Sequence, residues 1–146
     1  MFRVALVCVV VLGALSCDSP LEVPGEFSVS ARAALPDMQP PPNFEYVLAA
    51  AALPDGRIEI KGTFWGDLCG SEVRPSFTVG EGEARLHLTM EQVVSDPLCL
   101  AWVAFSEYVA TFRDLSPGSY RVRVEHDDRR FEDHRPTFDL GEVVVR

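Results

Sequence analysis

The feature that most constrains the fold of this chain is the alternation of apolar and polar residues in short segments. Residues 85–90, with the sequence RLHLTM, are one example, and residues 120–125, YRVRVE, are another. A period of two is typical of a strand with one buried face, and no segment shows a sustained helical period. Turn residues separate the segments about every 8 to 12 positions. The sequence therefore predicts an all-β fold, a single two-sheet β-sandwich of about seven or eight strands over residues 44–146, with strands at 44–52, 57–64, 73–79, 85–90, 99–105, 108–112, 120–125 and 140–145.

The most specific segment of the sandwich is residues 115–124, with the sequence LSPGSYRVRV. A chain that crosses between two sheets must satisfy its backbone groups at the bend, and a tyrosine on the inward pattern can do so. The segment resembles the entry to the penultimate strand of fibronectin type III and related immunoglobulin-like modules, and bacterial carboxypeptidase-regulatory-like and collagen-adhesin B-type modules carry a similar stretch. The resemblance implies that Leu115 plugs the end of the core, that Pro117 and Gly118 turn the chain, and that the Tyr120 hydroxyl bonds back to the backbone. It covers about ten residues and specifies an immunoglobulin-like architecture, not an activity.

The N-terminal residues have the organisation of a signal peptide that ends at a cysteine. Arg3 supplies a short basic start, residues 4–15 form an uncharged apolar run, and Ser16 precedes Cys17. The run has about a dozen residues, whereas a helix that spans a bilayer needs roughly 20. The stretch resembles the lipobox of bacterial lipoproteins, in which the cysteine thiol receives a diacylglyceryl group and becomes the acylated first residue of the mature chain.

This resemblance implies that residues 1–16 are removed as a lipoprotein signal peptide. The protein is then expected in the bacterial cell envelope, held to a membrane by lipid on Cys17, with palmitate among the expected acyl chains, and facing the periplasm or the cell exterior. The alternative is an ordinary secretory peptide cut near Ser16, which leaves Cys17 as a free or paired thiol.

Residues 17–43, which begin with the expected lipidated cysteine, are rich in proline, with a run of three at 40–42. Proline fixes backbone dihedrals and offers no donor, so this segment is predicted to be a semi-extended tether between the membrane and the sandwich. The alternative is that residues 27–34 pack as an extra edge strand.

The four cysteines divide by position. Cys8 leaves with the signal peptide and Cys17 is the candidate lipid site, which leaves Cys69 and Cys99 in an oxidising compartment. We expect these two to form a disulfide that closes a loop of about 30 residues. A zinc site is the competing interpretation, but neither cysteine has a second Cys or a His at ligand spacing.

The net charge of the chain is −9 at pH 7, which repels phosphate backbones. The basic pair Arg129 and Arg130 is flanked by acidic residues on both sides. Nucleic acid is therefore not expected as a partner.

Two further features bear on chemistry. Residues 125–134, EHDDRRFEDH, contain ligand types for a divalent cation, but their spacing fits neither an EF-hand loop nor a zinc helix, and a solvated hairpin is the simpler interpretation. We expect no metal and no other cofactor. Trp65 follows the second expected strand, where an exposed aromatic ring can stack on a sugar or anchor a protein partner; alternatively, it covers the end of the core. The chain contains no nucleophile elbow, zinc-protease motif or phosphate-binding glycine loop, and we expect no catalytic residues.

These features predict a cell-envelope lipoprotein that displays a small, disulfide-stapled β-sandwich and works by binding or by structural presentation. The expected partners are the membrane, through the lipid anchor, and an envelope protein or a glycan. The alternative is a carbohydrate-binding module that uses exposed aromatic side chains such as Trp65.

Overall fold

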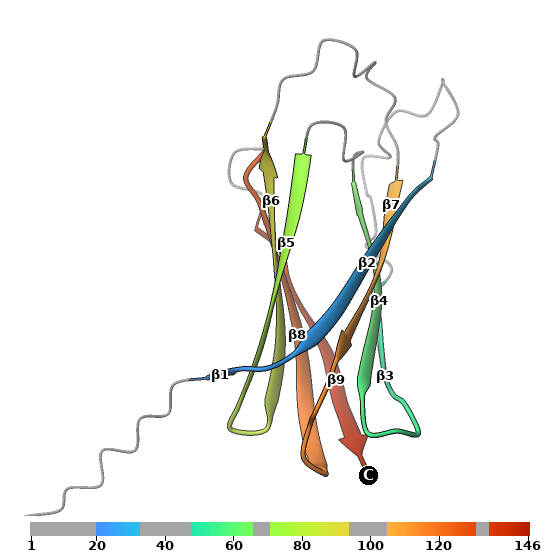
Figure 1. The fold of residues 1–146 in the computed structure, drawn as a ribbon. Coiled ribbons are helices and arrows are strands. Elements are labelled where there is room, and N and C mark those ends of the chain that lie inside the picture. The colour runs from blue at the N-terminus through green and yellow to red at the C-terminus, as the bar shows by residue number, and fades with distance from the viewer. Residues whose placement is uncertain (1–19, 33–47, 66–70, 94–104, 131–134) are drawn as a thin grey trace, which may run out of the picture.

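The computed structural model describes residues 20–32, 48–65, 71–93, 105–130 and 135–146. These residues form nine strands in two facing sheets (Figure 1), which confirms the predicted all-β sandwich. The strands are β1 (Leu21–Glu22), β2 (Gly25–Arg32), β3 (Ala49–Ala52), β4 (Ile58–Trp65), β5 (Ser71–Gly80), β6 (Glu83–Gln92), β7 (Phe105–Phe112), β8 (Gly118–Asp128) and β9 (Thr137–Val145).

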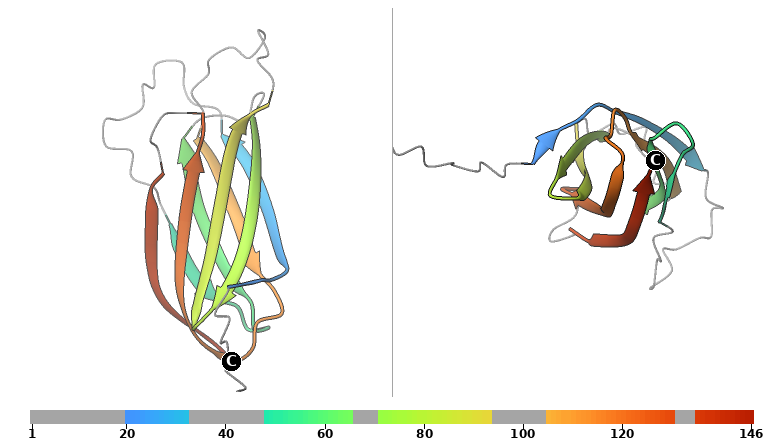
Figure 2. Two further views of the ribbon diagram at one scale, coloured as in Figure 1. Left: turned by 90° about the vertical axis from the view of Figure 1, so that its left-hand side faces the viewer. Right: turned by 90° about the horizontal axis from the view of Figure 1, so that it is seen from below.

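One sheet has five strands in the order β1-β5-β6-β8-β9, and the other has four in the order β2-β7-β4-β3 (Figure 2). Neighbouring strands are antiparallel except for β6 and β8, which run parallel from Glu83 opposite Arg121 to Met90 opposite Asp128. Parallel neighbours need a crossover connection. Here the crossover includes β7, which belongs to the opposite sheet.

The core lies between the inward faces of the two sheets. On β6 and β8 the predicted alternation is confirmed, because Leu86, Leu88, Val122 and Val124 are fully buried, while Arg85 and Arg121, on the alternate positions of these strands, are exposed. Burying a side chain of this size stabilises the fold by on the order of 1.5 to 3 kcal/mol.

The N-terminal strands correct the predicted domain boundary. Strand β1 pairs with β5, and β2 pairs along its whole length with β7, from Gly25 opposite Phe112 to Arg32 opposite Phe105. Phe27 of β2 packs against the core. The chain changes sheets between β1 and β2, where the Pro24 carbonyl accepts a hydrogen bond from the backbone of Arg113. The prediction of a tether over residues 17–43 is therefore wrong for residues 21–32, and the alternative of an extra edge strand holds for residues 27–32.

Two other predicted strands fall partly outside the described residues. Strand β3 begins at Ala49, and residues 44–47 of the expected first strand lie outside the described part. Only the end of the strand expected at 99–105 is described, as the first residue of β7.

The two ends of the sandwich differ. The turns at 53–57, 80–83 and 113–118 lie at one end, together with β1 and the C-terminus, and we name this the turn end (Figure 1). Strands β4, β6 and β8 finish at the opposite end, which we name the far end (Figure 1).

Candidate functional site

Strand β8 carries buried polar side chains at the far end. The structure extends this strand to Asp128, and His126, Asp127 and Asp128 have exposed fractions of 1%, 6% and 4%. The interpretation of residues 125–134 as a solvated hairpin is therefore wrong for residues 126–128. Burial of these groups requires partners for their hydrogen-bonding atoms.

His126 finds one partner in the opposite sheet. The Oη atom of Tyr108 on β7 lies 3.0 Å from His126 Nε2, and both side chains are buried. Burial raises the pKa of the Tyr108 hydroxyl far above its usual value, so the group stays protonated and can donate to the imidazole. The bond joins the two sheets through the interior.

Asp128 is paired with an arginine two residues along the chain. Arg130 Nε lies 2.8 Å from Asp128 Oδ1, and its Nη2 lies 2.8 Å from Oδ2, which makes the contact bidentate. The two side chains are 8% and 5% exposed. Two parallel charge-assisted bonds offset part of the cost of removing both charges from water.

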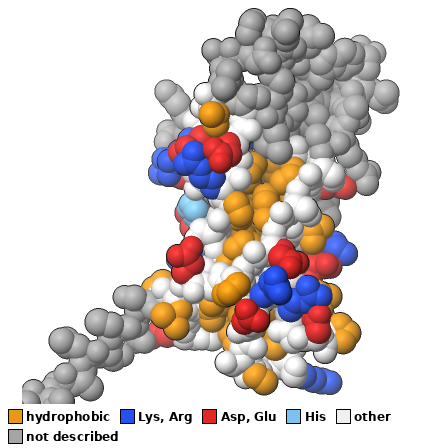
Figure 3. Space-filling view, in the orientation of Figure 1, with side chains coloured by type: hydrophobic (Ala, Val, Ile, Leu, Met, Phe, Trp, Pro, Cys, Tyr) orange, Lys and Arg blue, Asp and Glu red, His pale blue; other side chains and the backbone are white. Residues whose placement is uncertain are grey.

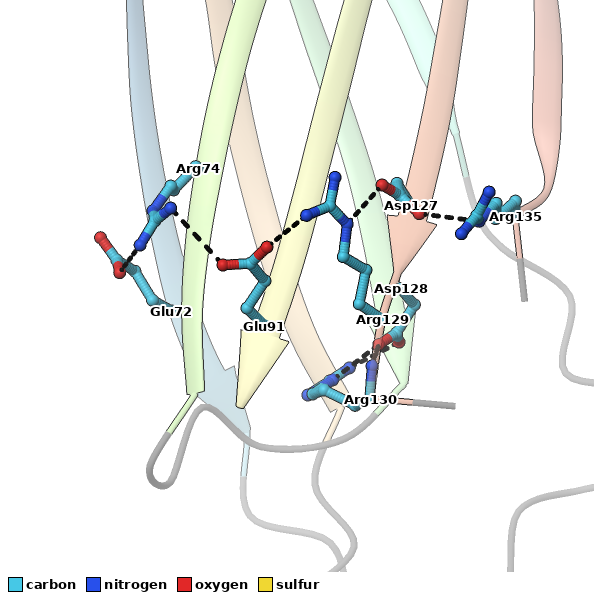
Figure 4. Close-up of polar contacts among 8 residues, drawn as sticks. All are labelled: Glu72, Arg74, Glu91, Asp127, Asp128, Arg129, Arg130 and Arg135. Atoms are coloured by element: carbon cyan, nitrogen blue, oxygen red, sulfur yellow. Dashed lines mark hydrogen bonds and ion pairs between the residues drawn. The ribbon is translucent and has the colours of Figure 1, made fainter. Parts of the chain in front are cut away.

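A chain of alternating charges covers the outer face of the same region (Figure 4). Arg74 Nη2 lies 2.9 Å from Glu72 Oε2, and Arg129 bridges Glu91 to Asp127. Figure 3 shows a group of charged side chains of both signs near the far ends of β5 and β6, apart from a band of hydrophobic side chains. The chain continues from Arg74 to Glu91 and from Asp127 to Arg135.

The electrostatics of this chain follow from its hydrogen bonds. The Arg129 guanidinium bonded to Asp127 holds the pKa of that carboxyl below its usual value, and Arg74 does the same for Glu72. Each charge in the chain contacts an opposite charge, which is the arrangement of a structural network. Within the described residues, no three His, Cys, Asp or Glu side chains are placed to hold a metal ion.

The described residues form one candidate for ligand binding, a groove of about 520 Å³ on the outer face of the four-stranded sheet. One row of residues runs across β2, β7, β4 and β3 as Ser28, Val109, Lys61 and Ala49. A second row contributes Ser30, Glu107 and Thr63. The small side chains on the edge strands β2 and β3 leave space beside the longer Lys61 and Glu107 on the central strands.

The chemistry of the groove suits a polar ligand. Val109 gives an apolar floor, and the hydroxyls of Ser28, Ser30 and Thr63 can donate or accept hydrogen bonds. Lys61 and Glu107 add one charge of each sign. An apolar surface with a few polar groups is the usual composition of a binding site.

The corner on β8 is built as the sequence indicates. The Tyr120 hydroxyl donates to the Ser116 carbonyl oxygen at 2.8 Å, and Tyr120 is 8% exposed. Leu115 is half-buried and packs against the core. Gly118 is the first residue of β8, and Pro117 before it is exposed.

The remaining predicted site residues lie outside the described part. Trp65 is the last residue of β4 and its backbone pairs with Phe105, but its side chain is not among those described. Cys17, Cys69 and Cys99 fall outside the described residues altogether.

The groove was not predicted from the sequence. Its residues occupy the polar positions of alternating strands, and β2 supplies two of them from a segment predicted to be a tether. Alternation of Phe27 and Val29 with serines was the available signal.

The described part of the chain contains no helix that is long and apolar enough to cross a membrane. No family model, curated protein or solved structure matches this chain.

Proposed function

We propose that this protein is a cell-envelope lipoprotein, acylated at Cys17, that displays the sandwich for binding or structural presentation and has no enzymatic activity. The observation that carries the proposal is the position of Cys17 relative to the fold. All nine described strands follow this cysteine, and the first paired residue is Leu21. Cleavage before Cys17 would therefore remove nothing from the two sheets.

The groove supports a binding role. It lies on the outer face of the four-stranded sheet, and it combines an apolar floor with hydroxyls and charges. A polar chain or ring from an envelope protein or a glycan would find hydrogen-bonding partners there.

The anchor is tested by substituting its acceptor. Cys17→Ser should abolish incorporation of an acyl label and move the protein from the membrane fraction to the soluble fraction, because a hydroxyl is not acylated in this way. Ser19→Ala, two residues away, is the control and should stay with the membrane. If the Cys17→Ser variant partitions into the detergent phase as the unmodified protein does, the proposal is contradicted.

A carbohydrate-binding module is the second candidate, and one observation favours it. Thr63 lines the groove, and Trp65 follows it two residues later at the end of β4. Aromatic rings beside hydrogen-bonding groups are suited to hold sugars, because one face of a sugar ring is apolar.

Co-sedimentation with insoluble cell-wall polysaccharide tests this candidate. Trp65→Ala should weaken binding at least tenfold, and Ser28→Trp should block the groove by bulk. Thr89→Trp adds the same bulk to the outer face of the other sheet and should bind as the unmodified protein does. Binding that survives both groove substitutions would exclude the module.

A further inference from the structure

The folded part of the chain begins very close to the proposed lipid site. Only Asp18, Ser19 and Pro20 separate Cys17 from Leu21, the first residue of β1. A fully extended chain spans at most about 3.6 Å per residue, so the Cα atoms of Cys17 and Leu21 lie within about 14 Å of each other. Any orientation that this short connection imposes on the sandwich rests on the proposed acylation of Cys17.

Leu21 is held at the turn end of the sandwich. It pairs with Val79 on β5, and the backbone N–H of Val23 donates to the Phe77 carbonyl at 2.9 Å. Pro20 also lies against β5, because a Cβ built at Gly80 would be 3.2 Å from its Cα. The chain therefore enters the fold beside the β5–β6 turn, at the end opposite the charged network (Figure 1).

The bilayer fixes the other end of this short connection. The headgroup region on each side of the hydrocarbon core is roughly 5 to 7 Å thick. Acyl chains inserted in the core hold Cys17 at that level, so about 14 Å of chain cannot carry the sandwich away from the surface.

We propose that the turn end docks on the lipid surface that carries the anchor, with β1 and the β5–β6 turn at the headgroups and the far end pointing away. The membrane contact would include Leu21, which is 72% exposed although it is a large apolar side chain. Its neighbours Glu22 and Glu81 are exposed carboxylates. These charges favour a surface of zwitterionic headgroups and oppose one rich in anionic lipid.

This orientation determines what the protein presents. The charged network and the far-end residues of β4, β6 and β8 would face away from the bilayer, while the groove on the outer face of the four-stranded sheet would lie at the side of the sandwich and stay exposed.

Lipid-phase quenching tests the orientation with the acylated full chain in phosphatidylcholine vesicles that contain a shallow quencher lipid. A fluorophore is attached to Glu22→Cys at the turn end or to Val93→Cys at the far end, where the exposed fraction of the native side chain is 58%. Labelling of the unmodified chain gives the background from native thiols. We expect the Glu22→Cys probe to be quenched at least threefold more strongly, and more weakly when anionic lipid replaces part of the phosphatidylcholine. Equal quenching, stronger quenching at residue 93 or none at either position would overturn the proposal.

Flotation of the same samples separates the two claims. A chain that floats with the vesicles but shows no preferential quenching contradicts only the docked orientation. A chain that does not float contradicts the anchor and with it the orientation. Insertion of about ten Gly and Ser residues between Ser19 and Pro20 is the control: it adds a mean reach of roughly 17 Å, so it should keep flotation and abolish the difference between the probes.

Discussion

Gly62 on β4 and Tyr108 on β7 lie directly opposite each other on neighbouring strands, and the tyrosine ring covers the glycine. A Cβ at position 62 would lie closer than 3.0 Å to three atoms of the Tyr108 side chain, its Oη included. The same ring lies beside Phe64, and its hydroxyl reaches His126 in the other sheet. The missing side chain of Gly62 thus helps to set the position of a hydrogen bond between buried side chains of the two sheets.

Gly62→Ala should destabilise the protein by about 1 to 3 kcal/mol, because the added methyl group displaces a ring that is packed on all sides. Urea unfolding measures the loss. Gly118→Ala is the matched control, since a Cβ there would have no atom closer than 3.8 Å, and it should cost about 0.5 kcal/mol or less. Equal losses of unfolding free energy in the two variants would show that the Tyr108 ring can move aside without a cost in stability.

Tyr120→Phe should cost about 1 kcal/mol, because it removes only the bond to the Ser116 carbonyl, which water can partly replace. Leu115→Ala should cost about 1 to 2 kcal/mol, less than a fully buried leucine would. Arg121→Ala on the outward face should stay within about 0.5 kcal/mol, although Arg121 pairs with Asp139. Thermal or urea unfolding of the three variants gives the order, and a larger effect at Arg121 than at Leu115 would contradict the assigned faces.

Several parts of the fold were predictable because their signal is local. The period of two at 85–90 and 120–125 reports a buried face directly, and the Tyr120 corner needs only a partner four residues earlier. Strand β2 lacked such a signal. Its partner β7 is far away in the sequence, only Phe27 and Val29 mark its inner face, and the surrounding prolines favoured a tether. The parallel pairing of β6 and β8 was equally hidden, because strands of either direction have the same side-chain period.

The end of β8 was misread for a different reason. Charged residues usually mark solvated turns, and Asp127 and Asp128 are buried only because arginines contact them. A count of polar residues does not show which charges are paired in space. The groove was hidden in the same way, since Ser28 and Ser30 gain their role only once β2 is known to be a strand.

The Asp128–Arg130 pair predicts non-additive losses. Asp128→Asn or Arg130→Met alone leaves a buried charge without its partner and should cost about 3 to 5 kcal/mol. The double variant should cost clearly less than the two single losses together. The exposed pair Glu72 and Arg74 is the control, with a coupling energy below about 1 kcal/mol. Additive losses at Asp128 and Arg130, measured by urea unfolding, would show that the buried pair is not coupled.

Acid should destabilise the protein through its paired carboxylates. Hydrogen bonds to Arg129 and Arg121 hold the pKa values of Asp127 and Asp139 below the usual value, which an unfolded chain keeps near 3.9. The unfolded state therefore takes up protons first as the pH falls, so the stabilisation is complete well above pH 4 and is lost below it. Melting temperatures between about pH 6 and pH 3 should fall less steeply for Asp127→Asn than for the unmodified protein. High salt should weaken the contribution of the exposed Asp139 pair.

Formation of a disulfide between Cys69 and Cys99 stays a prediction, which the described strand ends favour. Cys69 lies between β4 and β5, and Cys99 between β6 and β7. The ends of β4 and β7 are paired at Trp65 and Phe105, and those of β5 and β6 at Ser71 and Gln92, so both connections link the same two pairs of strand ends.

Closing a loop of about 30 residues should stabilise the fold by roughly 3 to 4 kcal/mol in the chain-entropy model. For a domain of this size, reduction should therefore lower the melting temperature by roughly 10 °C. The mature chain with Cys17→Ser is suited to the measurement, because it carries no lipid. A further Cys69→Ser, Cys99→Ser variant should melt at the temperature of the reduced protein and should not respond to reductant. The prediction fails if the folded, air-purified protein has two free thiols, or if reductant leaves its melting temperature unchanged. Either result would show that Cys69 and Cys99 do not form a stabilising disulfide.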